Sequence, residues 1–517
     1  MAVTRRTAIL SSALGVLAPG AVAARPKVPA RVDAVERHLA DLDRIVAETM
    51  KRTGVPGMSI VVVSRDRVVY LKGFGVRRAG GAEPVDADTA FALASLSKPL
   101  ATTVVAGLVG DGAVTWDDKI VRHLPDFAMS DPWVTREITL RDMFCHRSGL
   151  PDHAGDLLED IGYGRDEVLH RLRYVKPAGA FRASYAYTNF GFTAAAVAAA
   201  RAVGKSWEEL SAERLYRPLG MSNTSSRYAD LAARVNRAFG HVRRDGVWVV
   251  GPQREPDAQS PAGGANSTAR DMAAWVRLQL GRGALDGREI VKASALDETH
   301  RPQIATGPAD PANAAPTFYG LGWDIGYNER PLVHWGHSGA FSLGAATCVN
   351  ILPAQQLGIV ALSNASPVGA PEAICRSFID LVTAGKIERD WLALFGGIFA
   401  KMSEPTYGRD ADYSAPPMVA AAPADLAAYA GTYNSNLYGP IAITQNVNAL
   451  ALQMGPKNTS YDMHKYSKNL FTFQPPGENA FGLSPLRFTF DGNKKASSVE
   501  IDYFNENGQG VFTRARP

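Results

Sequence analysis

The spacing of apolar residues near the start of the chain changes from a strand pattern to a helical one. In residues 58–75 two apolar blocks flank the polar residues 65–67, which predicts an antiparallel β-hairpin. From Ser95 to about residue 109 the apolar spacing is helical, and it stops at Gly110. Because proline is tolerated in the first turn of a helix, Pro99 predicts a helix start near Ser95.

The middle of the chain reads as helices between two groups of strands. Residues 138–272 are mostly helical in pattern, with loops rich in proline and glycine. Strands are expected at 332–334, 344–352 and 358–362, followed by a helix at 371–383. The pattern therefore predicts an α+β fold, in which a helical region is inserted between sheet elements that are distant in sequence.

The last part of the chain predicts a separate, smaller β domain. Residues 403–422 hold prolines and small residues without periodicity, which is typical of a linker. Short alternating segments follow at 441–444, 449–453, 470–473, 486–490, 498–503 and 510–513. We therefore expect a main domain at 33–390 and a small β-barrel or sandwich at 423–517.

The first residues predict an export signal. Arg5 and Arg6 precede an apolar stretch at 7–22, and residues 21–23 offer a small-residue cleavage site, so a signal peptide is expected at 1–23. Thr4-Arg5-Arg6 resembles a twin-arginine signal. We therefore expect a periplasmic or secreted protein, with no stable membrane insertion after cleavage. The apolar stretch is shorter than the roughly 20 residues that span a bilayer.

Composition and charge remove several classes of partner. The chain of 517 residues is 46% hydrophobic and 21% charged, as in ordinary soluble proteins. Two of the 55 basic residues lie in the signal, which leaves 53 against 51 acidic ones and argues against a nucleic-acid surface. Cys145, Cys348 and Cys375 show no zinc-binding spacing. We expect buried thiols with at most one disulfide, and no metal or cofactor.

The first candidate for chemistry is the pair Ser95 and Lys98. Residues three apart lie on one face of a helix, which brings the lysine amine to the serine hydroxyl as a base. The amine must be neutral to act, so burial should lower its pKa. A Ser-x-x-Lys pattern is weak evidence by itself, because it arises about once by chance in a chain of this composition, and the alternative is a surface helix with an ordinary lysine.

Two further motifs supply the other groups that such a pair needs. Tyr187 can carry the proton between serine and leaving group, and Asn189 can hold the substrate carbonyl and the lysine. His337 can contact a substrate carboxylate or assist proton movement, and Gly339 leaves room for the substrate. The N–H of Ala340 is the expected second oxyanion donor. His334 is a competing histidine of unassigned role.

The order Ser-x-x-Lys, Tyr-x-Asn, His-x-Gly resembles that of the serine β-lactamases, penicillin-binding proteins and their esterase and aminopeptidase relatives. Further segments are similar to that family at 91–99, 117–125, 146–151, 217–221, 262–264 and 319–323, and the resemblance covers about 33–386. It implies an antiparallel sheet flanked by helices, a helical subdomain, and a cleft site between them. Residues 429–433 resemble the opening of the lipocalin-like barrels that follow some of these domains.

One departure from the family pattern bears on the substrate. Many family members have Lys-Thr-Gly where this chain has His337-Ser338-Gly339, so a permanent cation for a substrate carboxylate is missing there. The resemblance therefore implies a serine hydrolase for small peptides with D-residues or unusual linkages, acting through an acyl-enzyme on Ser95. The alternatives are a carboxylesterase, and less favoured a β-lactamase or a non-catalytic binding protein.

Overall fold

The computed structural model describes residues 32–306, 316–327, 332–415, 425–492 and 494–516. Its centre is an eight-stranded antiparallel sheet. In spatial order the strands are β2 (Arg67–Gly75), β1 (Gly57–Ser64), β14 (Leu357–Ser363), β13 (Ala345–Leu352), β12 (Val333–Phe341), β11 (Asp324–Tyr327), β10 (Phe318–Tyr319) and β9 (Ile304–Ala305). Sheet partners β1 and β14 are about 300 residues apart in the chain.

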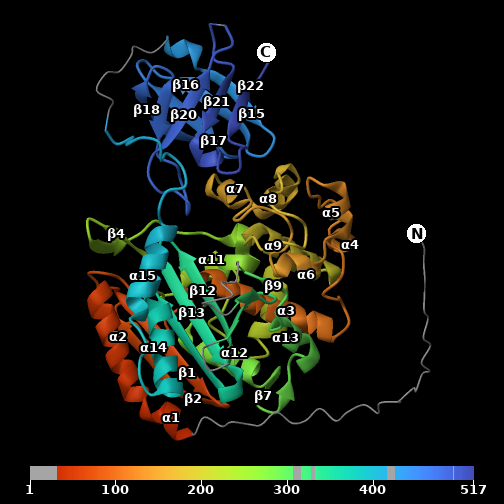
Figure 1. The fold of residues 1–517 in the computed structure, drawn as a ribbon, viewed down its shortest axis with the longest axis vertical. Helices are drawn as coiled ribbons and strands as arrows, with labels where there is room; N and C mark the ends of the chain where they lie inside the picture. The colour runs from red at the N-terminus through yellow and green to blue at the C-terminus, as the bar shows by residue number, and fades with distance from the viewer. Residues whose placement is uncertain (1–31, 307–315, 328–331, 416–424, 493, 517) are drawn as a thin grey trace, which may run out of the picture.

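The central strands are buried on both faces. Val61 and Val63 of β1 point into one hydrophobic core, whereas Ile60 and Val62 point into the other. This follows from the two-residue period of a strand, and it explains why β1 reads as a continuous apolar run. Helices α2 and α14 cover one face, while α12 and α3 lie on the other (Figure 1).

The α+β prediction is confirmed, and helices α3 to α13 lie between β2 and β9 in the chain. The helices are α1 (Val32–Arg37), α2 (Leu39–Thr53), α3 (Ser97–Gly110), α4 (Ile120–His123), α5 (Pro132–Glu137), α6 (Leu140–Phe144), α7 (Asp156–Asp160), α8 (Arg165–Arg171), α9 (Asn189–Ala202), α10 (Trp207–Ser211), α11 (Tyr228–Ala233), α12 (Ala269–Leu280), α13 (Ala293–Thr299), α14 (Ala370–Ala384) and α15 (Trp391–Met402). Three two-stranded pairs complete this part: β3 (Phe91–Ala92) with β6 (Asn266–Ser267), β4 (His241–Arg244) with β5 (Val247–Val250), and β7 (Ala284–Leu285) with β8 (Arg288–Glu289).

Two boundaries near the expected site differ from the sequence prediction. The strand expected at 332–334 continues as β12 to Phe341, so His337 and Gly339 lie inside a strand. The helix expected from Ser95 begins at Ser97, because residues 94–96 form a 3-10 turn, η1 (Ala94–Leu96). The predicted hairpin at 58–75 is confirmed as β1 and β2, and the helix at 371–383 as α14.

The carboxy-terminal part is a closed eight-stranded barrel. Its strands are β15 (Gly431–Ser435), β16 (Gly439–Gln445), β17 (Leu450–Met454), β18 (Thr459–Ser467), β19 (Leu470–Phe473), β20 (Ser484–Thr489), β21 (Ser498–Ile501) and β22 (Val511–Arg514). Pairing of β15 with β22 closes the ring. Six strands were expected from the sequence; β15 and β18 are additional.

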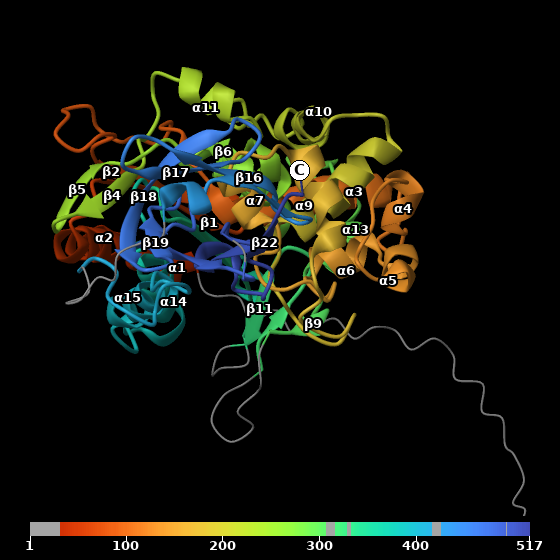
Figure 2. The same ribbon diagram turned by 90° about the horizontal axis from the view of Figure 1, so that it is seen from above.

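The barrel packs against the helical side of the main domain. Figure 1 shows it beyond α7 and α8, and Figure 2 looks down on it over the middle of the molecule. Tyr163 donates to the Tyr438 carbonyl at 3.2 Å, and Arg171 to the Leu437 carbonyl at 2.9 Å. The expected export signal and residues 416–422 of the expected linker lie outside the described residues. Among the described helices, none is both long and apolar enough to cross a membrane.

Candidate active site

Ser95 sits on a tight turn in front of α3. Ala94, directly before it, has a φ of 47°, a left-handed conformation that costs an alanine about 1 kcal/mol. The buried Ala94 methyl packs on Phe341 and Ala345 at the end of β12 and the start of β13. The turn is therefore held against the sheet, and the partly exposed Ser95 follows it at the N-terminal end of α3.

Lys98 is fully buried and has three polar neighbours. Its Nζ lies 3.2 Å from Ser95 Oγ, 2.7 Å from Asn189 Oδ1 and 3.0 Å from the Ala262 carbonyl. A neutral amine has two N–H donors and one lone pair. It can therefore donate to Asn189 and Ala262 while it accepts the Ser95 proton.

Burial lowers the pKa of Lys98 to about 7, although the negative charges of Asp156 and Asp324 raise it in part. A substantial fraction of the amine is therefore neutral near pH 7. That is the protonation state that a base for Ser95 requires. The geometry and the titration of Lys98 favour the same role.

Tyr187 lies beside both Ser95 and Lys98. It is hydrogen-bonded to Ser95, and its ring centroid is 4.4 Å from Lys98 Nζ. Burial raises the pKa of the phenol, against a smaller lowering by the Ser95 hydrogen bond. Tyr187 is therefore a neutral phenol at physiological pH, and it suits proton transfer as a carrier rather than as a phenolate base.

Asn189, the first residue of α9, connects Lys98 to a buried carboxylate. Its Nδ2 donates to Asp156 Oδ2 at 2.8 Å, so its Oδ1 must face Lys98. His153 Nδ1 lies 2.8 Å from the same Asp156 oxygen. Sequence reasoning missed Asp156. Its only signal was an acidic residue three positions after a histidine, in the stretch that follows a family-like segment.

His337 is held by protein groups on both ring nitrogens. Its Nδ1 lies 2.6 Å from the Ser338 carbonyl and must donate, so Nε2 accepts from the Tyr319 hydroxyl at 2.9 Å. Burial and the charge of Lys98 lower the pKa of His337 to about 3. His337 is therefore neutral and anchored to Tyr319. Its expected contact with a substrate remains a prediction.

Gly339 is required for a different reason from the one expected. A Cβ there would lie 2.3 Å from the Leu93 carbonyl, 2.3 Å from Thr347 Oγ1 and 3.1 Å from the Leu96 nitrogen. The space in question is occupied by the turn that carries Ser95, not left open for substrate. Glycine thus lets β12 run directly against the nucleophile turn.

Ala340 follows on the part of β12 that has no partner strand on its outer side. Strand β11 pairs with β12 only from Val333 to Gly336. The role of Ala340 as an oxyanion donor remains a prediction. His334, at the other end of β12, packs over Gly326, where a Cβ would lie 2.2 Å from its ring. Burial lowers the pKa of His334 to about 4.

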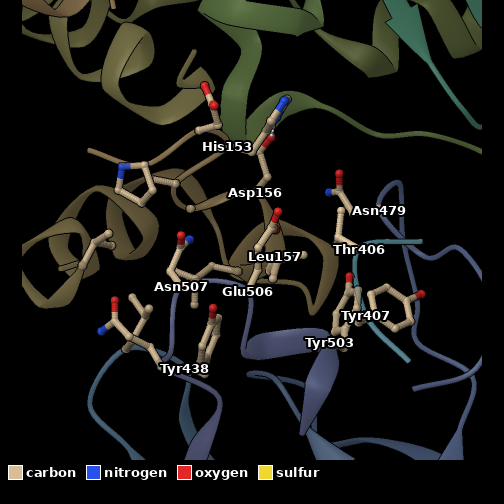
Figure 3. A pocket seen from close by; sticks show the side chains of 18 of the residues that line it. His153, Asp156, Leu157, Thr406, Tyr407, Tyr438, Asn479, Tyr503, Glu506 and Asn507 are labelled. Atoms are coloured by element: carbon tan, nitrogen blue, oxygen red, sulfur yellow. Dashed lines mark hydrogen bonds and ion pairs between the residues drawn. The ribbon is translucent and has the colours of Figure 1, made fainter. Parts of the chain in front are cut away.

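A cavity of 180 Å³ lies between residues 151–158 and the barrel (Figure 3). His153 and Asp156 line it from the main domain, and Tyr438 and Tyr503 from the barrel. Asp156 also accepts a hydrogen bond from Asn189, which contacts Lys98. The cavity therefore lies between the barrel and the hydrogen bonds around Lys98. Within the described part of the chain, no group of three His, Cys, Asp or Glu side chains could hold a metal ion, and the three cysteines are buried and free.

A serine beside a buried amine, a neutral tyrosine and an asparagine, set at the edge of an antiparallel sheet, defines the serine hydrolases of the β-lactamase fold. The chain belongs to the β-lactamase family: the family model described as Beta-lactamase matches residues 42–384. Relatives named as hydrolase and as penicillin-binding protein support a hydrolase of this family.

Two curated relatives share about a quarter of the aligned residues. The unguisins hydrolase ungD' of Aspergillus campestris is 26% identical over 426 residues, which cover 78% of this chain and 77% of that protein. Penicillin-binding protein 4 of Amycolatopsis lactamdurans is 28% identical over 323 residues, covering 60% and 81%.

Among solved structures, the octameric penicillin-binding protein homologue from Pyrococcus abyssi is similar in fold. Its TM-score is 0.58 at 18% identity, and the match covers 92% of this chain and all of that one. The family model and the two curated relatives confirm the expected resemblance to the β-lactamase and penicillin-binding-protein family, and this structure confirms the fold.

Proposed function

We propose that the protein is a peptidase that opens amide bonds in small peptides with D-residues or unusual linkages, through an acyl-enzyme on Ser95. The observation that carries the proposal is the buried Lys98 amine at 3.2 Å from Ser95 Oγ, with its pKa lowered to about 7. The similarity to a relative named unguisins hydrolase, over 78% of this chain, supports hydrolysis as the reaction.

These positions support the following reaction. Lys98 takes the Ser95 proton while Oγ bonds to the substrate carbonyl carbon, and the N–H groups of Ser95 and Ala340 stabilise the oxyanion. The carbon–nitrogen bond then breaks, and the leaving amine takes a proton that passes through Tyr187. Water adds to the resulting ester by the same route in reverse, which frees the acid product and restores Ser95.

The test is a panel of D- and L-peptides, short-chain nitrophenyl esters and a cephalosporin, assayed beside Ser95→Ala. Turnover of D-residue peptides that is lost in Ser95→Ala is the expected result. Good ester turnover with no peptide turnover would replace the proposal with the carboxylesterase alternative. Cephalosporin hydrolysis as the main activity would indicate a β-lactamase. Failure of a fluorophosphonate probe to label Ser95 would indicate a binding protein.

The proposal includes export, since residues 1–23 have the pattern of a signal peptide. A near balance of 53 basic and 51 acidic residues after its removal gives no support to nucleic-acid binding. Fractionation of cells that express the full chain, with mass spectrometry of the mature amino terminus, tests this. Intact chain in the cytoplasmic fraction would contradict it.

A further inference from the structure

A second cavity lies at the end of β12 beyond Phe341. It has a volume of 340 Å³, and its wall combines aromatic side chains, Phe91, Tyr228 and Phe341 among them, with three arginines. No aspartate or glutamate lines it among the described residues. A cavity with cationic groups and apolar rings, but no carboxylate of its own, fits a ligand that carries an anion on an apolar body.

Two of the three arginines have no carboxylate partner. Arg254 pairs with Glu159 at 2.5 Å, so its charge is compensated. Arg78 and Arg237 form no ion pair with a described residue, and both guanidiniums lie near the Phe239 ring, at 5.4 and 4.9 Å from its centroid. Both cations lie over one ring, and each would attract an anion that enters the cavity.

The cavity is close to the nucleophile. Its residues Ala92, Phe341 and Ala345 pack around Ala94, which precedes Ser95 in the chain. Strand β12 (Val333–Phe341) holds both His337 and Phe341, so one strand connects a candidate site residue with the wall of this cavity. The cavity therefore lies beside the turn that carries Ser95.

The arginines of this cavity supply a positive charge that His337 does not. His337 is neutral, with both ring nitrogens bonded to protein groups, and it offers no cation to a substrate carboxylate. Two carboxyls that act on Tyr228, those of Glu255 and Asp257, stand outside the cavity wall. Arg237 Nη1 donates to the carbonyls of Ala232 and Arg234. The cationic groups without a carboxylate partner here are therefore Arg78 and the remaining N–H groups of Arg237.

We propose that this cavity is a subsite for a carboxylate on the acyl part of the substrate, bound by Arg78 and Arg237. The assignment rests on the proposed acyl transfer at Ser95, and it narrows the substrate class to acyl groups with a negatively charged end. Arg78 is exposed and Arg237 partly so, so solvent and salt should weaken the contact without abolishing it.

The first test measures binding without turnover. The full-length Ser95→Ala protein is titrated with glutarate and with the neutral glutaramide by calorimetry. Glutarate should bind about ten-fold more tightly, as expected for charge-assisted hydrogen bonds at a partly exposed site. The double variant Arg78→Gln/Arg237→Gln should lose this preference, whereas Arg244→Gln, an exposed arginine outside the cavity, should keep it. Equal binding of the two compounds would overturn the proposal.

The second test uses nitrophenyl esters of glutaric acid and of its monoamide. The kcat/KM ratio should favour the charged ester about ten-fold in otherwise native protein and approach one in the double variant, with the neutral ester unaffected. An unchanged ratio, or glutarate that fails to compete with the charged ester, would overturn the subsite. Selective glutarate binding without turnover of any ester or peptide would instead overturn the proposed function and leave the subsite standing.

Discussion

Burial lowers the pKa of a base at the catalytic centre, whereas it raises the pKa of two acids at the interface between the main domain and the barrel. At the centre one lysine faces Asp156 and Asp324, and burial lowers its pKa to about 7. At the interface with the barrel, Arg254 lies near the carboxyls of Glu159 and Glu478. Burial raises the pKa of each of these two carboxyls to about 7. Burial disfavours the charged form in both places. A rise in pH through 7 therefore activates the base and adds negative charge between the domains.

The barrel is hydrogen-bonded to the residue that follows β12, the strand that carries His337. The Glu478 carboxylate accepts from the Ser342 backbone N–H and, at 2.9 Å, from the Ser342 hydroxyl. Asp160 accepts from the Glu478 N–H at 2.8 Å and from the Tyr503 hydroxyl at 2.9 Å. Ser342 follows β12 directly, so the barrel holds the end of that strand. The two regions are distinct in chemistry but share one strand.

The largest effect on activity is expected for a substitution at the catalytic centre. Lys98→Met should lower kcat/KM by about a thousand-fold or more, because Ser95 loses its base while the fold keeps a side chain of similar length. The initial rate of fluorophosphonate labelling at Ser95 is the measurement. Lys386→Met, at an exposed position, is the control and should label at the normal rate. Equal labelling of both variants would contradict the role of Lys98.

Gly339→Ala tests how closely β12 must lie against the nucleophile turn. The new Cβ would collide with the Leu93 carbonyl and Thr347 Oγ1, each at 2.3 Å, and push the strand away from Ser95. We expect kcat/KM to fall about a hundred-fold, as for the loss of one oxyanion donor. Gly397→Ala, where nothing lies within 4 Å, is the matched control. Full activity in Gly339→Ala would show that the strand position is not critical.

The elements that could be predicted from the sequence are those whose burial gives a clear apolar pattern. Strands β1, β13 and β14 are apolar runs, and the order of Ser95, Tyr187 and His337 indicated the family. Strand β18 was missed because Met463 is its one buried side chain, and β15 because Tyr433 is its one buried side chain. A strand with one inward residue has no alternation to detect.

The parts of the site that could not be predicted depend on contacts between distant segments. Asp156 matters through Asn189, 33 residues later, and Glu478 through Ser342, 136 residues earlier. The role of Gly339 followed from the path of the Leu93 backbone, which no local pattern indicates. Sequence reasoning named the groups that can react, but not the groups that orient them.

The pH dependence of activity should follow the pKa of Lys98, which burial lowers and the charges of Asp156 and Asp324 raise. The kcat/KM value should rise with pH through about 7, as the amine loses its proton. Asp156→Asn removes a negative charge that raises the Lys98 pKa, so this limb should move to lower pH, by about one unit or less. Asp324→Asn should move it in the same direction while it leaves the Asn189 contact intact. A limb that stays fixed in both variants would assign it to another group.

The smallest expected effect is at the interface, where Glu478→Gln should flatten the pH dependence of stability. The folded-state pKa of Glu478 is raised to about 7, whereas an unfolded glutamate titrates near 4.3. Between these values the unfolded chain has lost the proton that the folded chain keeps, so stability falls as pH rises. Below the window both states are protonated, and above it both are ionised.

The measurement is the free energy of unfolding from denaturant curves between pH 5 and 8. The glutamine keeps an acceptor for Ser342 but has no proton to lose, so the variant should lack up to about 1.4 kcal/mol per pH unit of the decline. Glu506→Gln, at an exposed position on the barrel, should keep the native slope. Because Lys98 titrates in the same range, Ser95 labelling should still rise with pH in Glu478→Gln. If labelling and stability changed together, the two charge clusters would act as one titrating unit through β12.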